Sequence, residues 1–197
     1  MPFSIPAMIA LAAACAPDVA PRTLLAVAQV ESGFDPLAIG LEGGARGLRP
    51  ADLEAAVGQA SALIAAGRNI DLGLAQINSR NLGWLGLTPR TAFDPCRNLE
   101  AGARVLKAGY RRAAPTPGRE QPALRVALSY YNTGHPQGGL RNGYVAKVSA
   151  AAARLDLAPA PIAPPETPPT PAWDVFAQAR ADRAAVLVFA AHPGAQP

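Results

Sequence analysis

The sequence contains few residues that could bind a metal ion or build a histidine-based nucleophile. Its 197 residues include two cysteines, Cys15 and Cys96, and two histidines, His135 and His192. No spacing among these four residues is typical of a zinc site, and a Ser-His-Asp triad has little more support. We therefore expect no metal site and no cofactor.

The chain also lacks a run of basic residues. Its 18 lysines and arginines are scattered along the sequence and stand against 14 acidic residues, which gives a net charge of +4. Without a basic cluster, we expect no nucleic-acid-binding patch. A net charge of this size is compatible with an anionic partner but is too small to identify one.

An apolar segment at residues 7–16 is too short to cross a membrane. It is also compatible with a secretory signal, but no lysine or arginine precedes Arg22, so the basic region of a signal is missing. Apolar residues from Ile5 to Ala12 recur at helical spacing, and Pro6 suits the first turn of a helix. We expect the first helix of a domain here and no evident export signal.

Proline content divides the chain into three parts. Residues 158–171 contain seven prolines in fourteen positions, which predicts an extended linker without a core of its own. Residues 1–157 are rich in alanine and in apolar residues at helical spacing, so they are expected to form one main domain. Residues 172–197 are expected to be an apolar tail that docks on a partner, packs on its own domain or stays disordered.

Helical periodicity and turn residues predict a mostly helical α+β domain with a small antiparallel hairpin. Residues 69–74 are expected to form a strand before a turn at 76–78, and the glycine-rich stretch 40–47 a loop or hairpin. The predicted helices are a first helix from about Ile5, one from Pro21 to Glu31, residues 50–66, a long helix after Asp94, one through Leu124 and Tyr131, and a last one from about Gly143 to Leu155.

Glu31 is the first candidate for chemistry. It falls on one helical face with Leu24, Val27 and Ala28. A carboxyl group on an apolar face loses hydration, so it holds its proton more tightly than in water. A carboxylic acid that stays protonated near neutral pH can act as a general acid. The alternative is a surface carboxylate at a helix end, with Gly33 as the stop.

Two further motifs connect Glu31 to a known family. Residues 73–77 read Gly-Leu-Ala-Gln-Ile, and residues 129–134 read Ser-Tyr-Tyr-Asn-Thr-Gly. Together with Glu31-Ser32 they resemble, in order, the Glu-Ser, Gly-Leu-x-Gln-Ile and Ala-Tyr-Asn-x-Gly motifs of lytic transglycosylases, with Tyr130 in place of the alanine. Over about residues 5–157 the chain is most similar to the peptidoglycan-cutting transglycosylases of type IV secretion and conjugation systems.

The resemblance implies a lysozyme-like fold and an activity. The implied reaction cleaves the β-1,4 bond between MurNAc and GlcNAc in peptidoglycan and leaves a 1,6-anhydro end, with Glu31 as acid and then base. Asp71 matches by position the second carboxylate of chicken-type lysozyme. A hydrolytic lysozyme-type muramidase therefore stays open, as does a glycan-binding scaffold without turnover.

Four polar side chains, Ser32, Gln76, Tyr131 and Asn132, are expected around the glycan. Each has a structural alternative. Ser32 could cap its helix, Gln76 could tie the hairpin to the helix behind it, and Asn132 could end a helix. Tyr131 could orient Glu31 through its hydroxyl or fill the core.

The implied enzyme class also sets expectations for location and partners. Glycan strands of peptidoglycan are the expected partner, the periplasm is the expected location, and secretion-system components are a further candidate partner for residues 172–197. Cys15 and Cys96 are predicted on buried helix faces. They would be free core residues in a reducing compartment, but the oxidising compartment that this class implies favours a disulfide between them.

Overall fold

The computed structural model describes residues 2–42 and 47–155. The predicted linker at 158–171 and the predicted tail at 172–197 lie outside the described residues, so both stay predictions. The described helices are α1 Ile5–Cys15, α2 Pro21–Glu31, α3 Leu53–Ala65, α4 Leu82–Leu85, α5 Pro89–Ala92, α6 Pro95–Arg112, α7 Glu120–Thr133, α8 Gly138–Arg141 and α9 Tyr144–Arg154, with a 3-10 turn, η2, at Ser79–Asn81.

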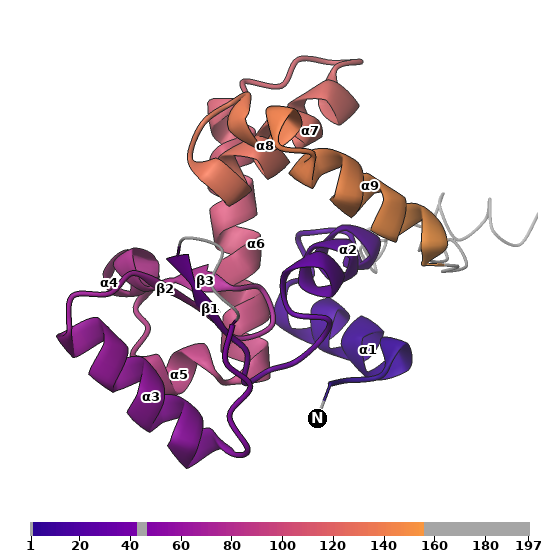
Figure 1. The fold of residues 1–197 in the computed structure, drawn as a ribbon. Coiled ribbons are helices and arrows are strands. Elements are labelled where there is room, and N and C mark those ends of the chain that lie inside the picture. The colour runs from indigo at the N-terminus through magenta and orange to yellow at the C-terminus, as the bar shows by residue number, and fades with distance from the viewer. Residues whose placement is uncertain (1, 43–46, 156–197) are drawn as a thin grey trace, which may run out of the picture. The chain divides into compact units, whose positions relative to one another are not determined.

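Helix α6 runs through the middle of the domain (Figure 1). Helices α1 and α2 lie on one side of it, the sheet with α3, α4 and α5 lies on the other, and α7, α8 and α9 cover one end. Asp94 begins α6 because its carboxylate accepts a hydrogen bond from the backbone N–H of Arg97 at 2.8 Å, and Pro95 occupies the first turn. The predicted start of the long helix is therefore confirmed.

The predicted hairpin is part of a larger sheet. Three short antiparallel strands, β1 Ile39–Leu41, β2 Ile70–Leu72 and β3 Ile77–Asn78, lie in the order β1-β2-β3. Asp71, in the central strand, is opposite Gly40 on one side and Asn78 on the other. The mostly helical α+β prediction is confirmed, and the glycine-rich stretch contributes the edge strand that the sequence left open.

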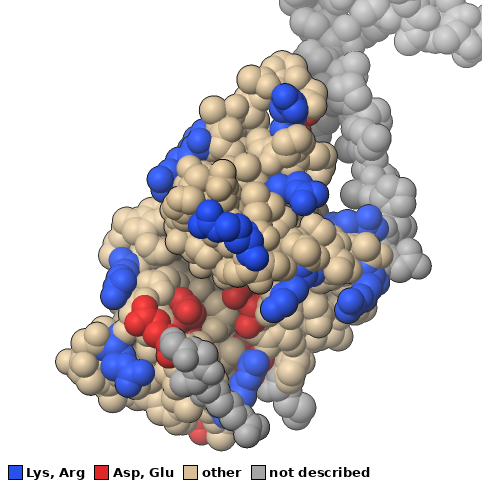
Figure 2. All heavy atoms as spheres, turned by 45° about the horizontal axis from the view of Figure 1, so that its top comes forward, with Lys and Arg blue, Asp and Glu red and all other residues tan. Residues whose placement is uncertain are grey.

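Two groups of buried side chains stabilise the two halves of the domain. The first joins α1, α2, α6, α7 and α9 and includes Met8, Leu25 and Leu99. The second lies between the sheet and α3, α4 and α5 and includes Ile70 and Phe93. Between the halves, one face of the domain is hollowed (Figure 2). No helix within the described ranges has both the length and the apolar character needed to span a bilayer.

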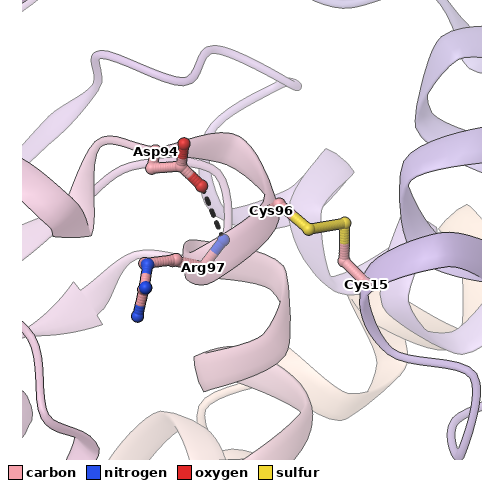
Figure 3. The surroundings of a disulfide bond; sticks show 4 residues. All are labelled: Cys15, Asp94, Cys96 and Arg97. Carbon is pink, nitrogen blue, oxygen red and sulfur yellow. Dashed lines mark hydrogen bonds between the residues drawn. A yellow bond between two sulfur atoms is a disulfide. The ribbon is translucent and has the colours of Figure 1, made fainter.

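The predicted disulfide between Cys15 and Cys96 is present (Figure 3). It joins the last residue of α1 to the first turn of α6, with 5.3 Å between the two Cα atoms. The predicted burial was wrong, since Cys15 is half-buried and Cys96 is exposed. Both cysteines lie at helix ends and are at least partly exposed, so the bond ties two helix ends near the surface rather than filling the interior.

Removal of this disulfide should destabilise the domain measurably. The bond closes a loop across a sequence separation of 81 residues, and loop entropy alone predicts a stabilisation of about 4 kcal/mol. The double variant Cys15→Ser/Cys96→Ser should unfold at a lower denaturant concentration than the oxidised parent. Reductant should lower the midpoint of the parent and leave that of the double variant unchanged. Equal midpoints for all these samples would show that the bond does not stabilise the fold.

Candidate active site

The hollow on this face is a cleft of about 590 Å³. The sheet side contributes Asp71, Gln76 and Asn78, and the end of α7 contributes the segment Tyr130–Gly134. Glu31 reaches the same cleft from the end of α2. Acidic side chains gather in the hollow while Lys and Arg side chains are spread over the surface around it (Figure 2).

Glu31 is placed in the cleft by the way in which α2 ends. It is the last residue of the helix, and Ser32 caps it with its backbone N–H on the carbonyl of Ala28 at 3.0 Å. Gly33 then adopts φ +66°, a left-handed conformation that reverses the chain. Phe34 follows and is buried. The carboxyl group therefore projects from a rigid corner between a core helix and a core aromatic ring.

The surroundings of Glu31 favour its protonated form. Burial raises the pKa of its carboxyl group from an ordinary value of 4.5 to about 7, and the neighbouring negative charge of Asp71 acts in the same direction. The Tyr144 hydroxyl donates a hydrogen bond to Oε1 of Glu31 at 2.6 Å and limits the rise. Burial also raises the pKa of Tyr144, so this hydroxyl remains a donor. The result is a carboxyl group that can both lose and regain a proton near neutral pH.

Asp71 lines the same cleft from the central strand of the sheet. The Asn78 side chain donates a hydrogen bond to its Oδ1 at 2.9 Å across the β2–β3 pair. Burial raises the pKa of Asp71, and this hydrogen bond lowers it. Asp71 and Glu31 thus face one space in different surroundings, which is the condition under which two carboxyl groups take different roles.

The turn between β2 and β3 is held by Asn98, a residue of α6 whose side chain is 1% exposed. Its Nδ2 donates to the carbonyls of Leu72 at 2.9 Å and Ala92 at 2.7 Å, and its Oδ1 accepts from the N–H of Ala75 at 2.7 Å. Gly73, at φ +74°, lies so close to this amide that a side chain there would collide with it. The turn is therefore fixed to α6.

Three of the predicted site residues attach to this turn. The hydroxyl of Ser32 lies 2.8 Å from the carbonyl oxygen of Leu74, and the hydroxyl of Tyr131 donates to the carbonyl of Ala75 at 2.6 Å. Nε2 of Gln76 donates to the carbonyls of Gly73 at 2.9 Å and Ala38 at 3.1 Å. These bonds connect the cap of α2, the helix α7 and the residue before β1 to one short segment of backbone.

The structure separates Ser32 from the other predicted site residues. Gln76, Tyr131 and Asn132 line the cleft with the two carboxyl groups. Ser32 is 3% exposed and its hydroxyl faces main-chain carbonyls, so the expected place beside the glycan is wrong for it and the alternative of a helix cap fits. A hydroxyl at the last turn of a helix commonly bonds back to the preceding turn, which accounts for the difference.

Asn132 lies at the rim of the cleft. It is exposed, and its Oδ1 accepts a hydrogen bond from Nδ2 of Asn142 at 2.8 Å. Helix α7 continues through Asn132 to Thr133, and Gly134 ends the helix in a left-handed conformation. Asn132 therefore does not end the helix, and that alternative was wrong.

The residue that hydrogen-bonds Glu31 is Tyr144, which the sequence did not single out; Tyr131, one candidate for that contact, donates to Ala75 instead. The signal was present, because Tyr144, Val148, Ala151 and Leu155 recur at helical spacing on the inward face of α9. A tyrosine on a buried stripe needs a partner for its hydroxyl. The sequence could not identify that partner, since the contact joins residues 113 positions apart.

Comparisons with known proteins identify the family of the chain. The family profile described as "Transglycosylase SLT domain" matches residues 8–150. The type IV secretion system protein virB1 of Brucella suis is 43% identical over 201 residues, covering 95% of this chain and 83% of the relative. The protein virB1 of Rhizobium radiobacter is 46% identical over 152 residues, covering 77% of this chain and 62% of the relative.

A third relative, the protein virB1 of Agrobacterium fabrum, is 45% identical over 141 residues, covering 72% of this chain and 57% of the relative. No solved structure matches the chain significantly. The family match covers most of the described domain and contains all three motifs. The chain therefore belongs to the transglycosylase SLT domain family and is a lytic transglycosylase of peptidoglycan with a lysozyme-like fold.

Proposed function

We propose that Glu31 is the catalytic acid and base that cleaves the β-1,4 bond between MurNAc and GlcNAc and leaves a 1,6-anhydro end on MurNAc. The observation that carries this proposal is the half-buried carboxyl group of Glu31 in the cleft, with a pKa raised to about 7 and one oxygen bonded to Tyr144. A group with this pKa is matched to donating and then accepting one proton near neutral pH.

The reaction uses Glu31 twice. Its Oε2, the oxygen that does not face Tyr144, donates a proton to the glycosidic oxygen while the bond from C1 to that oxygen breaks, and GlcNAc leaves with a hydroxyl group. The MurNAc ring then has oxocarbenium character at C1. The 6-hydroxyl of the same ring attacks C1, and the ionised Glu31 takes the hydroxyl proton. Glu31 is thereby restored, and no water enters the product.

Tyr144 positions Glu31 in both steps. Its hydrogen bond to Oε1 at 2.6 Å directs the other carboxyl oxygen toward the cleft and becomes stronger when Glu31 ionises. Asp71 carries negative charge in the same cleft and stabilises the positive ring electrostatically without attacking it. Gln76 and Tyr131 act mainly by holding the walls of the cleft, and the exposed Asn132 contacts the sugar.

The biological role is local opening of the cell wall for a type IV secretion or conjugation system, in the periplasm. The Brucella suis relative carries the name of a type IV secretion system protein and aligns over 95% of this chain. The domain division stands as part of this proposal, with residues 1–157 as the enzyme, 158–171 as a linker and 172–197 as a segment that docks on secretion-system components. The number of apolar side chains in that tail supports a docking role.

Replacement of Glu31 by glutamine should abolish turnover without unfolding the protein. Gln keeps the shape and the acceptor for Tyr144 but has no proton to transfer, so we expect a rate loss of about 1,000-fold or more on purified sacculi. A pKa raised from 4.5 to about 7 means that ionised Glu31 costs stability on the order of 3 kcal/mol well above pH 7. Glu31→Gln should therefore melt higher than the parent at pH 8. Retained activity would refute the assignment of the acid.

The pH dependence of kcat/KM should report Glu31 directly. The free enzyme needs the protonated carboxyl group, so the rate should fall as pH rises through about 7, the pKa to which burial raises Glu31. Tyr144→Phe removes the bond that lowers this pKa, so its descending limb should shift to higher pH. Asn132→Ala serves as the control, with a lower rate and an unchanged midpoint. A midpoint near 4.5 in the parent would contradict the role of burial.

The products distinguish transglycosylation from hydrolysis. Mass spectrometry of released muropeptides should show ends that are lighter by one water than hydrolytic ends. Asp71→Asn should reduce the rate by about 10- to 100-fold through lost electrostatic stabilisation and leave the product unchanged. Hydrated reducing ends from the parent, with complete loss in Asp71→Asn, would instead identify a lysozyme-type muramidase. Binding of glycan without any product would identify a scaffold.

A further inference from the structure

Charge is divided very unevenly along this chain. Residues 101–155 contain nine lysines and arginines and one acidic residue, a net charge of +8. Residues 1–100 contain seven basic and nine acidic residues, a net charge of −2. The small net charge of the whole protein therefore conceals a strongly basic segment, which folds as the greater part of α6 together with α7, α8 and α9.

Seven of these cations are exposed, and we name them the basic surface. None of the seven forms an ion pair with another residue of the part of the chain that the structure describes. By contrast, Arg49 and Arg90 in the first half are paired with Asp35 and Glu54. The basic surface consists of Arg111, Arg112, Arg119, Arg125, Arg141, Lys147 and Arg154.

The basic surface begins at the edge of the cleft. The guanidinium of Arg112 lies over the ring of Tyr130, 4.4 Å from its centroid, and Tyr130 lines the cleft. Arg141 is in α8, a few residues after Gly134, the last cleft residue of this segment. A polymer that leaves the cleft on this side therefore meets cations next.

The cleft itself has the opposite charge. Glu31, Glu42 and Asp71 line it, and Arg80 is the single cation among the lining residues that the structure describes. Carboxylates of a substrate are repelled from this acidic floor and attracted to the surface above it. The sugar chain of peptidoglycan is neutral, and its anionic groups are the carboxylates of the peptides attached to MurNAc. The charge pattern therefore favours the neutral sugar chain inside the cleft and the anionic peptides outside it.

We propose that the basic surface binds the carboxylates of peptidoglycan stem peptides outside the cleft and holds the enzyme on the cell wall. The proposal rests on the proposed function, because it takes peptidoglycan as the substrate. The contact of Arg112 with the cleft residue Tyr130 favours this occupant over an anionic membrane, which would not need cations beside the glycan site. Exposed cations also accelerate the encounter with an extended polyanion, and salt screens that attraction.

Two charge-reversal variants in the Glu31→Gln background test the placement of charge. Arg125→Glu/Lys147→Glu changes the basic surface, and Arg68→Glu/Arg97→Glu changes exposed cations of the first half by the same total charge. Cosedimentation with purified sacculi at low salt measures binding without cleavage. We expect about tenfold weaker binding for the first variant, less than twofold change for the second, and no difference between them at high salt.

Two further substrates identify the ligand. Sacculi whose peptide carboxylates have been converted to neutral amides should bind both variants equally, and a difference that persists on them would overturn the assignment to carboxylates. Vesicles containing an anionic phospholipid provide the membrane arm. If the first variant loses binding to vesicles and keeps its affinity for sacculi, the surface is a membrane site and the proposal is wrong. Equal losses for both variants on sacculi would reduce the effect to net charge and would also refute it. Because binding is measured without turnover, failure of the proposed chemistry would leave these results interpretable.

Discussion

The amide of Asn98 is the contact on which the geometry of the cleft depends. This one buried side chain makes three hydrogen bonds, to the main chain of Leu72, Ala75 and Ala92, and so fixes the β2–β3 turn to the central helix. The turn then offers its carbonyls to Ser32 of the capped α2 end and to Tyr131 of α7. A buried amide with all its groups satisfied rigidifies its surroundings, whereas a partial set would be costly. The walls of the cleft are therefore all attached to the β2–β3 turn that Asn98 holds in place.

Burial of Glu31 reduces the stability of the folded protein and favours the proton transfer proposed for this residue. Glu31 loses hydration at the junction of α2 with the cleft, which raises its pKa to about 7, and Tyr144 supplies one hydrogen bond in return. A carboxylate left fully in water would be ionised and could not protonate a leaving group at neutral pH. The same burial that weakens the folded state above pH 7 is thus what makes the group useful.

Surface charge and cleft charge are arranged in opposite senses. The acidic floor suits a reaction that builds positive charge on a sugar ring, because negative groups stabilise the transition state. The exposed cations from α6 to α9 attract the anionic peptides of the same polymer. Since exposed charges act over only about a Debye length in salt, they can orient a polymer at the cleft edge without altering the chemistry inside it.

The sequence by itself determined the class of fold, the order of its helices and the family, and it supplied Glu31 as the candidate acid. Apolar residues at helical spacing predicted the helices, because residues at that spacing fall on one face only if the segment is helical. Asp94-Pro95 and Gly33 marked helix ends through local backbone chemistry, and the order of three motifs identified the family. The Cys15–Cys96 disulfide was also predictable from the sequence. The chain has two cysteines, which can pair in one way, and the implied compartment is oxidising.

Tertiary structure alone decided which polar group serves which partner. Tyr131 and Tyr144 both lie on inward helix faces, and only the packing of α9 against α2 shows that Tyr144 reaches Glu31 while Tyr131 reaches Ala75. The same holds for Ser32, which faces main chain and not the cleft. Periodicity reports which side of a helix is buried. The partner of a hydrogen bond depends on distances of a few ångströms between segments far apart in sequence, and those distances exist only after the chain has folded.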